Sequence, residues 1–247
     1  FPAAVFRLWE TVPAERIALA LELPISAVLQ AADEMGLPAQ KVNPAWQTRG
    51  YITTIRNLAK YGVKVIVYNF MPVLDWTRSN LSLMLPDGSD VLCYDHCEVA
   101  AFDMFSLKRP NAKRDYDEET IDRAKILWEK CSPSMRARIE KSILLGLPGT
   151  VDDLTPQQFL DQLGAYKDID DATLRKHMYD FLNEITPVLD DTGVNMAIHP
   201  DDPPWDMFGL PRIITGMNSY DKLFAAVPNV HNGITLCTGS LGAGRDN

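Results

Sequence analysis

The chain lacks any long apolar run, since none of its 247 residues lie in a stretch approaching the 18 or so apolar residues of a membrane-spanning helix. A signal-peptide layout is also missing, because Arg7 and Glu10 follow closely behind the first apolar residues. Basic residues are in the minority: 24 Lys and Arg against 33 Asp and Glu give a net charge of -9. Nucleic-acid binders usually carry a basic patch. We therefore expect a cytoplasmic chain with neither a membrane nor a nucleic-acid partner.

Cysteine is scarce, and its spacing carries little information. The four cysteines are Cys93, Cys97, Cys131 and Cys237, and no two of them form a CxxC pair. With no export signal, reduced thiols are expected in preference to disulfides. A lone cysteine is most often a small buried apolar side chain. Apolar residues make up 46% of the chain, which is enough for a substantial core in one large domain or two small ones.

Two short helices are predicted within residues 1–45, the second capped by Ser26 and ending near Gly36. Two short helices joined by a tight turn can form a DNA-reading motif. The second helix, however, carries Asp33 and Glu34 and has no Lys or Arg to contact phosphate. Plain helical packing is therefore the favoured interpretation of this segment.

An α/β order begins with a helix predicted over residues 46–61, followed by Gly62 and the apolar run VKVIVYNF at 63–70. Such a β-branched run is typical of a strand buried on both faces of a parallel sheet. Two more strands are predicted at residues 194–200 and 233–240. A complete (β/α)₈ barrel needs eight strands in about 250 residues. Only three core strands are recognisable, so the sheet is expected to be incomplete and to have open strand edges.

A long insertion separates the first of these strands from the second. Two alternating runs within residues 81–95 flank Pro86, Asp87 and Gly88, which predicts a hairpin. Helices are predicted over residues 95–108, 117–130, 132–145, from 155 onward, 171–191 (with a kink at Pro187) and around 219–226.

Two predicted strands end in side chains that can bind a metal. His199 closes VNMAIHP, and Cys237 closes GITLC, 38 positions further on. Consecutive parallel strands bring such side chains to one rim, where α/β folds carry their active sites. Imidazole and thiolate suit Mn, Fe, Co or Zn. The alternative is a hydrogen-bonded structural histidine and a packed cysteine. Three other histidines lack a strand-end position and are interpreted as structural or surface residues: His96, His177 and His231.

A third polar cluster follows the first strand and contains Asn69, Asp75, Trp76 and Arg78. These residue types can hold a polyhydroxylated acid, since an arginine offers a bidentate partner for a carboxylate. An ordinary loop with a surface salt bridge between Asp75 and Arg78 is the alternative.

Several of these segments resemble one known family. They are YNFMPVLDWTR (68–78), LPDGS (85–89), LKRP (107–110), GLPG (146–149), YKDID (166–170), HPDDPP (199–204), GLPRI (209–213) and CTGS (237–240). In the same order, they are similar to motifs of the mannonate dehydratase family. The resemblance runs from about Arg56 to Asn247.

The resemblance implies a TIM (β/α)₈ barrel of the xylose-isomerase-like type, carrying an inserted hairpin and helices. It implies conversion of D-mannonate to 2-dehydro-3-deoxy-D-gluconate and water, in hexuronate (glucuronate) breakdown. It also implies Mn²⁺ or Fe²⁺ held by a His, a Cys, a second His and an Asp. His199 and Cys237 match the first two ligands. We predict that Asn69, Arg78 and Asp201 contact the sugar acid.

The sequence also departs from the family pattern. The second His, the Asp and the acid/base residues near it belong to later strands, so we expect no useful turnover from this chain alone. Residues 1–55 do not resemble the family and are interpreted as a helical segment of unknown role, ahead of an incomplete barrel at 56–247. Two alternatives remain open: a non-catalytic module that binds a sugar acid or a metal, and an interaction protein. Open strand edges would also permit a homo-oligomer.

Overall fold

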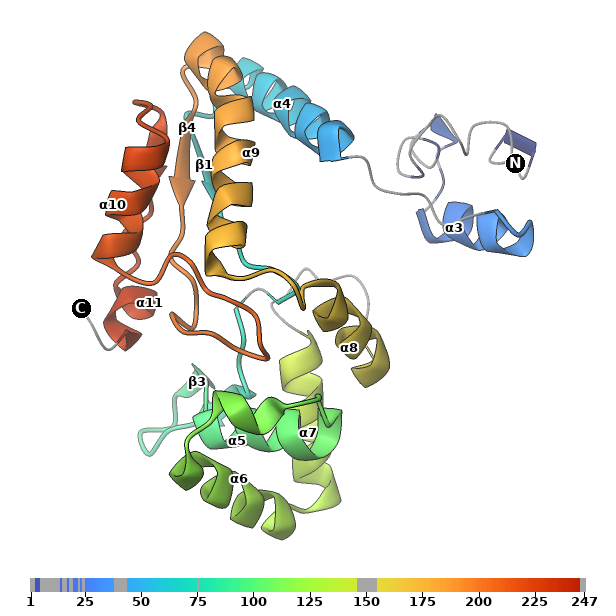
Figure 1. Ribbon diagram of the computed structural model, residues 1–247, viewed down its shortest axis with the longest axis vertical. Coiled ribbons are helices and arrows are strands. Elements are labelled where there is room, and N and C mark those ends of the chain that lie inside the picture. The colour runs from blue at the N-terminus through green and yellow to red at the C-terminus, as the bar shows by residue number, and fades with distance from the viewer. Residues whose placement is uncertain are drawn as a thin grey trace. The chain divides into compact units, whose positions relative to one another are not determined.

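The computed structural model (Figure 1) describes residues 3–4, 14, 17, 20–21, 23, 25–37, 44–74, 76–145 and 155–244. The chain divides into two compact units, residues 1–57 and 58–247.

The first unit contains α3 (Ile25–Glu34) and most of α4 (Pro44–Lys60). Val28 and Ala32, one helical turn apart on α3, are buried in a small apolar cluster. The helix ends where Gly36 adopts a φ of 64°, in the left-handed region that glycine tolerates. The second predicted N-terminal helix and the helix at 46–61 are confirmed. The cap predicted at Ser26 is wrong, because α3 already begins at Ile25. The first predicted helix lies largely outside the described residues.

The second unit is built on a parallel sheet of three strands in the order β1-β4-β5. They are β1 (Val65–Tyr68), β4 (Asn195–Ile198) and β5 (Asn232–Ile234). Val67 pairs with Ala197, which in turn pairs with Gly233, so these three residues share one face of the sheet. All three predicted strands are confirmed, and with them the α/β class. The third strand is shorter than predicted, because α11 (Thr238–Ala243) occupies the end of the segment predicted as strand.

Helices cover one face of this sheet. The long helix α9 (Asp171–Thr192) continues through Pro187 and then turns at Gly193 into β4, running antiparallel to it (Figure 1). Helix α10 (Met217–Ala226) leads to β5. On the covered face Met196 and Ile198 are fully buried, whereas on the other face Val65 and Val67 are 51% and 57% exposed. The prediction that the first strand is buried on both faces is therefore wrong for the described residues.

The insertion between β1 and β4 forms a hairpin followed by helices. The hairpin pairs β2 (Asn80–Met84) with β3 (Asp90–Cys93) in antiparallel fashion and turns at Gly88, as predicted. The helices are α5 (His96–Ala101), the π-helix η1 (Phe102–Leu107), the 3₁₀-helix η2 (Ala112–Asp115), α6 (Glu118–Lys130), α7 (Pro133–Leu145) and α8 (Pro156–Ala165).

Side-chain caps explain where several of these helices begin. The carboxylates of Asp95, Asp117 and Asp170 accept from backbone N–H groups at the starts of α5, α6 and α9. Thr155 and Gln158 form a reciprocal capping box on α8. The predicted helix at 95–108 is confirmed as helical, but its second half is a π-helix.

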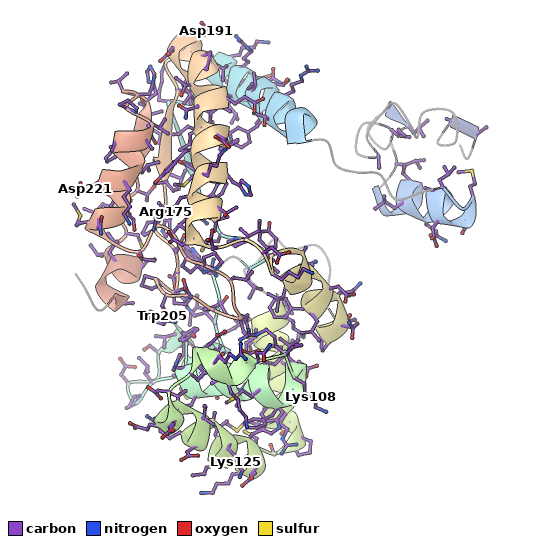
Figure 2. All side chains as sticks on the ribbon, in the orientation of Figure 1. Lys108, Lys125, Arg175, Asp191, Trp205 and Asp221 are labelled. Carbon is purple, nitrogen blue, oxygen red and sulfur yellow. The ribbon has the colours of Figure 1, made fainter. Side chains whose placement is uncertain are left out.

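The loop after β4 joins the insertion to the sheet. Phe208, from this loop, packs edge-to-face on Phe102 and Phe159 at centroid distances of 6.1 and 5.3 Å, inside the core of the insertion. Trp205, labelled in Figure 2, donates from its indole nitrogen to the hydroxyl of Tyr94 at 3.3 Å. The loop that follows a sheet strand is thereby held against the insertion.

A buried ion pair lies beside this junction. The carboxylate of Asp103 is fully buried in η1 and accepts from the guanidinium of Arg109 and from the hydroxyl of Tyr116. A Cβ at Gly209 would come within 3.0 Å of that guanidinium, so the absent side chain allows the close approach.

No helix among the described ranges is long and apolar enough to cross a membrane.

Candidate functional site

The predicted site residues follow the carboxyl ends of the three parallel strands. The N–H of His199 donates to the carbonyl of Tyr68 at 2.8 Å, and the N–H of Thr235 donates to the carbonyl of Ile198 at 2.8 Å. Each bond extends the strand pairing beyond the end of the regular sheet. The loops that carry Asn69, His199 and Cys237 therefore leave the same rim, as predicted from the strand-end positions.

His199 is buried, and one of its two ring nitrogens already makes a hydrogen bond. Its Nδ1 lies 2.7 Å from the carbonyl oxygen of Pro200, which can only accept, so Nδ1 carries a proton. In the neutral imidazole the lone pair then resides on Nε2, the arrangement seen in metal-binding histidines. The ring of Trp76, from the loop after β1, lies 5.4 Å from the imidazole.

Cys237 caps α11 and is partly exposed. Its Sγ lies 3.4 Å from the hydroxyl oxygen of Ser240. The Ser240 hydroxyl, helped by the backbone N–H groups of Ser240 and Gly239, lowers the pKa of the Cys237 thiol, against the opposing effects of burial and of the Asp202 charge. A lowered pKa favours the thiolate, which is the form that binds metals.

Arg78 has a partner that its neighbourhood in the sequence does not reveal. Its Nη1 and Nη2 donate to the two carboxylate oxygens of Asp202 at 2.8 and 3.0 Å. The predicted alternative partner, Asp75, lies outside the described residues. Asp202 also accepts from the hydroxyl of Ser240 at 3.0 Å. One carboxylate thus connects the loop after β1 with the turn that carries Cys237.

Asp201 is a buried acid that closes the loop after β4. One of its oxygens accepts from the N–H groups of Ile213 and Ile214 at 2.6 and 2.9 Å, and the other has no partner among the described residues. Burial raises the pKa of Asp201 to about 6, although these donors and the charge of Arg212 oppose the rise. The role predicted for it, contact with a substrate, stays a prediction.

Asn69 is exposed at the rim, one residue beyond β1. The alternation of the strand places it on the open face with Val65 and Val67. Further along the same loop, Val73 adopts a φ of 64°, a strained conformation for a β-branched residue. Such strain is concentrated at functional sites.

The donors present match part of a metal site. His199 offers a nitrogen lone pair, and Cys237 offers a thiol biased toward the thiolate, on neighbouring strand ends. Within the described ranges, no group of three or more His, Cys, Asp or Glu side chains is arranged to hold a metal ion. Two ligands of soft and intermediate character therefore fit a divalent transition metal, and they require further ligands to complete the set.

Two residues of this rim were not assigned a role from the sequence: Asp202 and Ser240. Asp202 lies within HPDDPP and Ser240 within CTGS, both of which carry the family resemblance. Their connection spans 124 positions between Arg78 and Asp202 and 38 between Asp202 and Ser240, so no local pattern reveals it.

Comparison with known proteins gives one consistent result. The family model described as D-mannonate dehydratase (UxuA) matches residues 29–247, a match that begins in α3, ahead of Arg56. The mannonate dehydratase of Saccharophagus degradans (strain 2-40) is 44% identical over 197 residues, which are 80% of this chain and 50% of that protein. The mannonate dehydratase of Marinomonas sp. (strain MWYL1) is 44% identical over 199 residues, 81% of this chain and 51% of that protein.

A solved structure agrees with these relatives. The crystal structure of mannonate dehydratase from Streptococcus suis serotype 2 superposes with a TM-score of 0.55 at 30% identity, covering 94% of this chain and 54% of that one. The chain spans about half the length of the relatives it matches. Matched across most of its own length, the chain belongs to the D-mannonate dehydratase family.

Proposed function

We propose that this chain supplies the metal-binding strand ends of a mannonate dehydratase, which converts D-mannonate to 2-dehydro-3-deoxy-D-gluconate and water. The observation that carries the proposal is the position of His199 and Cys237 at the same ends of neighbouring parallel strands. The lone pair on Nε2 of His199 and the lowered pKa of the Cys237 thiol both favour binding of a metal. The family relationship supplies the reaction.

We further propose that the three strands are part of a (β/α)₈ barrel. The strands are parallel, and helices cover one face while the apolar side chains of Val65 and Val67 stand open on the other. In such a barrel this open face is the packed interior, and the carboxyl ends of the strands form the active-site rim. Among the described residues, β1 and β5 each pair along one edge only, which fits a sheet that continues.

His199, through Nε2, and the thiolate of Cys237 would hold Mn²⁺ or Fe²⁺. The remaining ligands would come from the part of the family's length that this match does not cover. When bound, the metal supplies a Lewis acid for departure of the C3 hydroxyl. We assign no general base for the C2 proton.

The substrate would lie over the rim, beside the loop after β1. Asn69 lies exposed at this rim, on the open face of the sheet. Arg78 has given three of its five N–H hydrogens to Thr77 and Asp202, which leaves Nε and one hydrogen of Nη2 available within the described residues. Those two N–H groups can still donate to a carboxylate, so Arg78 can bind the sugar acid while it keeps its bonds to Asp202.

The proposal is tested by Mn²⁺ binding to the purified chain, followed by the loss of the free Mn²⁺ electron paramagnetic resonance signal. We expect weak but measurable binding that disappears in His199→Ala and in Cys237→Ser. The matched controls are His177→Ala, an exposed histidine on α9, and Cys93→Ser, which should both bind like the unmodified chain.

The outcome that overturns the metal site is Mn²⁺ binding left unchanged by both His199→Ala and Cys237→Ser. Formation of a 2-keto acid from D-mannonate should be absent in the chain alone, because the described residues hold only two of the ligands. Turnover by the isolated chain would show that this ligand count is wrong.

A further inference from the structure

We infer that Arg138, on α7 of the insertion, is a positioning residue that holds Arg78 in place at the rim. The inference rests on the proposed function, because contact between Arg78 and a sugar acid is part of that proposal. It gives the insertion, which contributes neither of the two proposed metal ligands, a part in substrate binding.

Ser79, the residue next to Arg78, is bonded to the insertion through its N–H, its hydroxyl and its carbonyl. The backbone N–H donates to the carbonyl of Cys93 at 3.0 Å, and the hydroxyl oxygen accepts from the N–H of Asp95 at 3.0 Å. The carbonyl accepts from Nη1 of Arg138 at 2.8 Å. Ser79 is fully buried, so water cannot replace these bonds. The backbone that carries Arg78 therefore has a fixed end point.

Arg138 is itself fixed by a second partner. Its Nη2 donates to the carboxylate of Glu98 on α5, a residue that is only 7% exposed. A buried carboxylate that lost this partner would be left as an uncompensated charge, so the ion pair resists opening. One guanidinium thus links α7, α5 and the backbone beside Arg78, and its planar fork fixes the direction of both bonds.

A second arginine holds the other end of the same segment. Nη1 of the buried Arg212, in the loop after β4, donates to the carbonyl of Leu74 at 3.1 Å. The chain between Leu74 and Ser79 is short, so Arg78 has little freedom to move away from Asp202. The N–H groups that Arg78 keeps for a carboxylate therefore point in one direction before the sugar acid arrives, which lowers the entropy cost of binding.

Arg138→Lys tests the inference. Lysine keeps a positive charge beside Glu98 but offers one donor nitrogen in place of two, so the two bonds cannot both keep their directions. The matched control is Arg136→Lys on the same helix, because Nη2 of Arg136 also donates to a backbone carbonyl, that of Trp128. A merely structural loss at α7 should affect both variants alike.

The first measurement needs neither metal nor substrate. In the ¹⁵N-labelled chain, the guanidinium N–H signals of Arg78 are assigned by their loss in Arg78→Lys, and their exchange with water reports how firmly the group is held. Exchange should become about 10-fold faster in Arg138→Lys, as expected when a hydrogen bond from a charged group is weakened, and stay unchanged in Arg136→Lys. An unchanged rate in Arg138→Lys, or equal acceleration in both variants, would overturn the inference. If Arg138→Lys does not fold, Ser79→Ala decides, because it removes one of the three bonds and should also speed the exchange; an unchanged rate there overturns the inference.

Calorimetric titration with D-mannonate separates this inference from the proposed function. The dissociation constant should rise about 10-fold in Arg138→Lys and stay unchanged in Arg136→Lys. If the unmodified chain binds D-mannonate and Arg138→Lys binds it equally well, the inference is overturned. If the unmodified chain binds no D-mannonate, the substrate contact assigned to Arg78 in the proposed function fails. The exchange rates then decide alone whether Arg138 holds Arg78: faster exchange in Arg138→Lys sustains it, and an equal rate overturns it.

Discussion

The buried carboxyl of Asp201 should make the fold less stable at neutral pH than at about pH 4. Its side chain is 1% exposed, and only one of its two oxygens has partners among the described residues. Burial penalises the charged form and raises the pKa of Asp201 from its ordinary 3.8 to about 6. The folded chain therefore holds this proton more strongly than the unfolded chain does.

The sign and size of the effect follow from that difference. A pKa raised in the folded state contributes stability that is fully present below the unfolded pKa and is lost as the pH rises through the folded one. Each unit is worth 1.36 kcal/mol, so a rise from 3.8 to about 6 corresponds to about 3 kcal/mol. About 2.4 kcal/mol of this stability should be lost between pH 4 and pH 7.

Urea unfolding of the chain and of Asp201→Asn, with a chelator present, would measure the effect across this range. Asparagine cannot ionise and keeps an oxygen for the same backbone donors. The free energy of unfolding of the variant, relative to the unmodified chain, should rise by about 2.4 kcal/mol from pH 4 to pH 7, because a small part of the effect falls below pH 4. Asp170→Asn is the control without a trend in this range, because donors from Thr173 lower the pKa of Asp170, and the stability linked to a lowered pKa is lost only below about pH 4. A pH-independent difference for Asp201→Asn would refute the argument.

Two further substitutions probe the insertion and its junction with the sheet by urea unfolding at pH 7. Asp103→Ala leaves the guanidinium of Arg109 without its buried partner and should cost about 3–5 kcal/mol, and a cost below about 1 kcal/mol would contradict the buried pair. Phe208→Ala removes a ring packed on two others and should also cost about 3–5 kcal/mol. Phe224→Ala, 38% exposed, is its milder control, and equal costs for the two would contradict this view of the core.

The elements that could be predicted from the sequence are those whose signals are local. Gly62 and the β-branched run after it predict β1, and the turn at Pro86 and Gly88 predicts the hairpin. The caps at Asp117 and Thr155 mark helix starts because a side chain there binds a backbone N–H three residues away. The strand-end positions of His199 and Cys237 also followed from such local patterns.

What could not be predicted depends on contacts between distant parts of the chain. The apolar run at 63–70 predicts burial on both faces of the strand. A single run, however, does not show whether other elements of the structure cover both faces of the sheet. GITLCTGS continues as a strand by propensity, yet its end turns into α11, where the Cys237 sulfur meets Ser240. The partner of Arg78 is separated from it by the whole insertion.

The position of that insertion also has a consequence for the order of folding. Val65 pairs with Asn195, 130 positions along the chain, whereas Met196 pairs with Asn232 only 36 positions on. Loop-closure entropy makes the longer pairing costlier by about 1 kcal/mol if the intervening chain is still unfolded. The insertion is rich in local contacts, within the hairpin and between α5 and α6, that can form early. Once it is compact, the ends of the loop start closer together, so the insertion acts as an internal folding scaffold for the sheet.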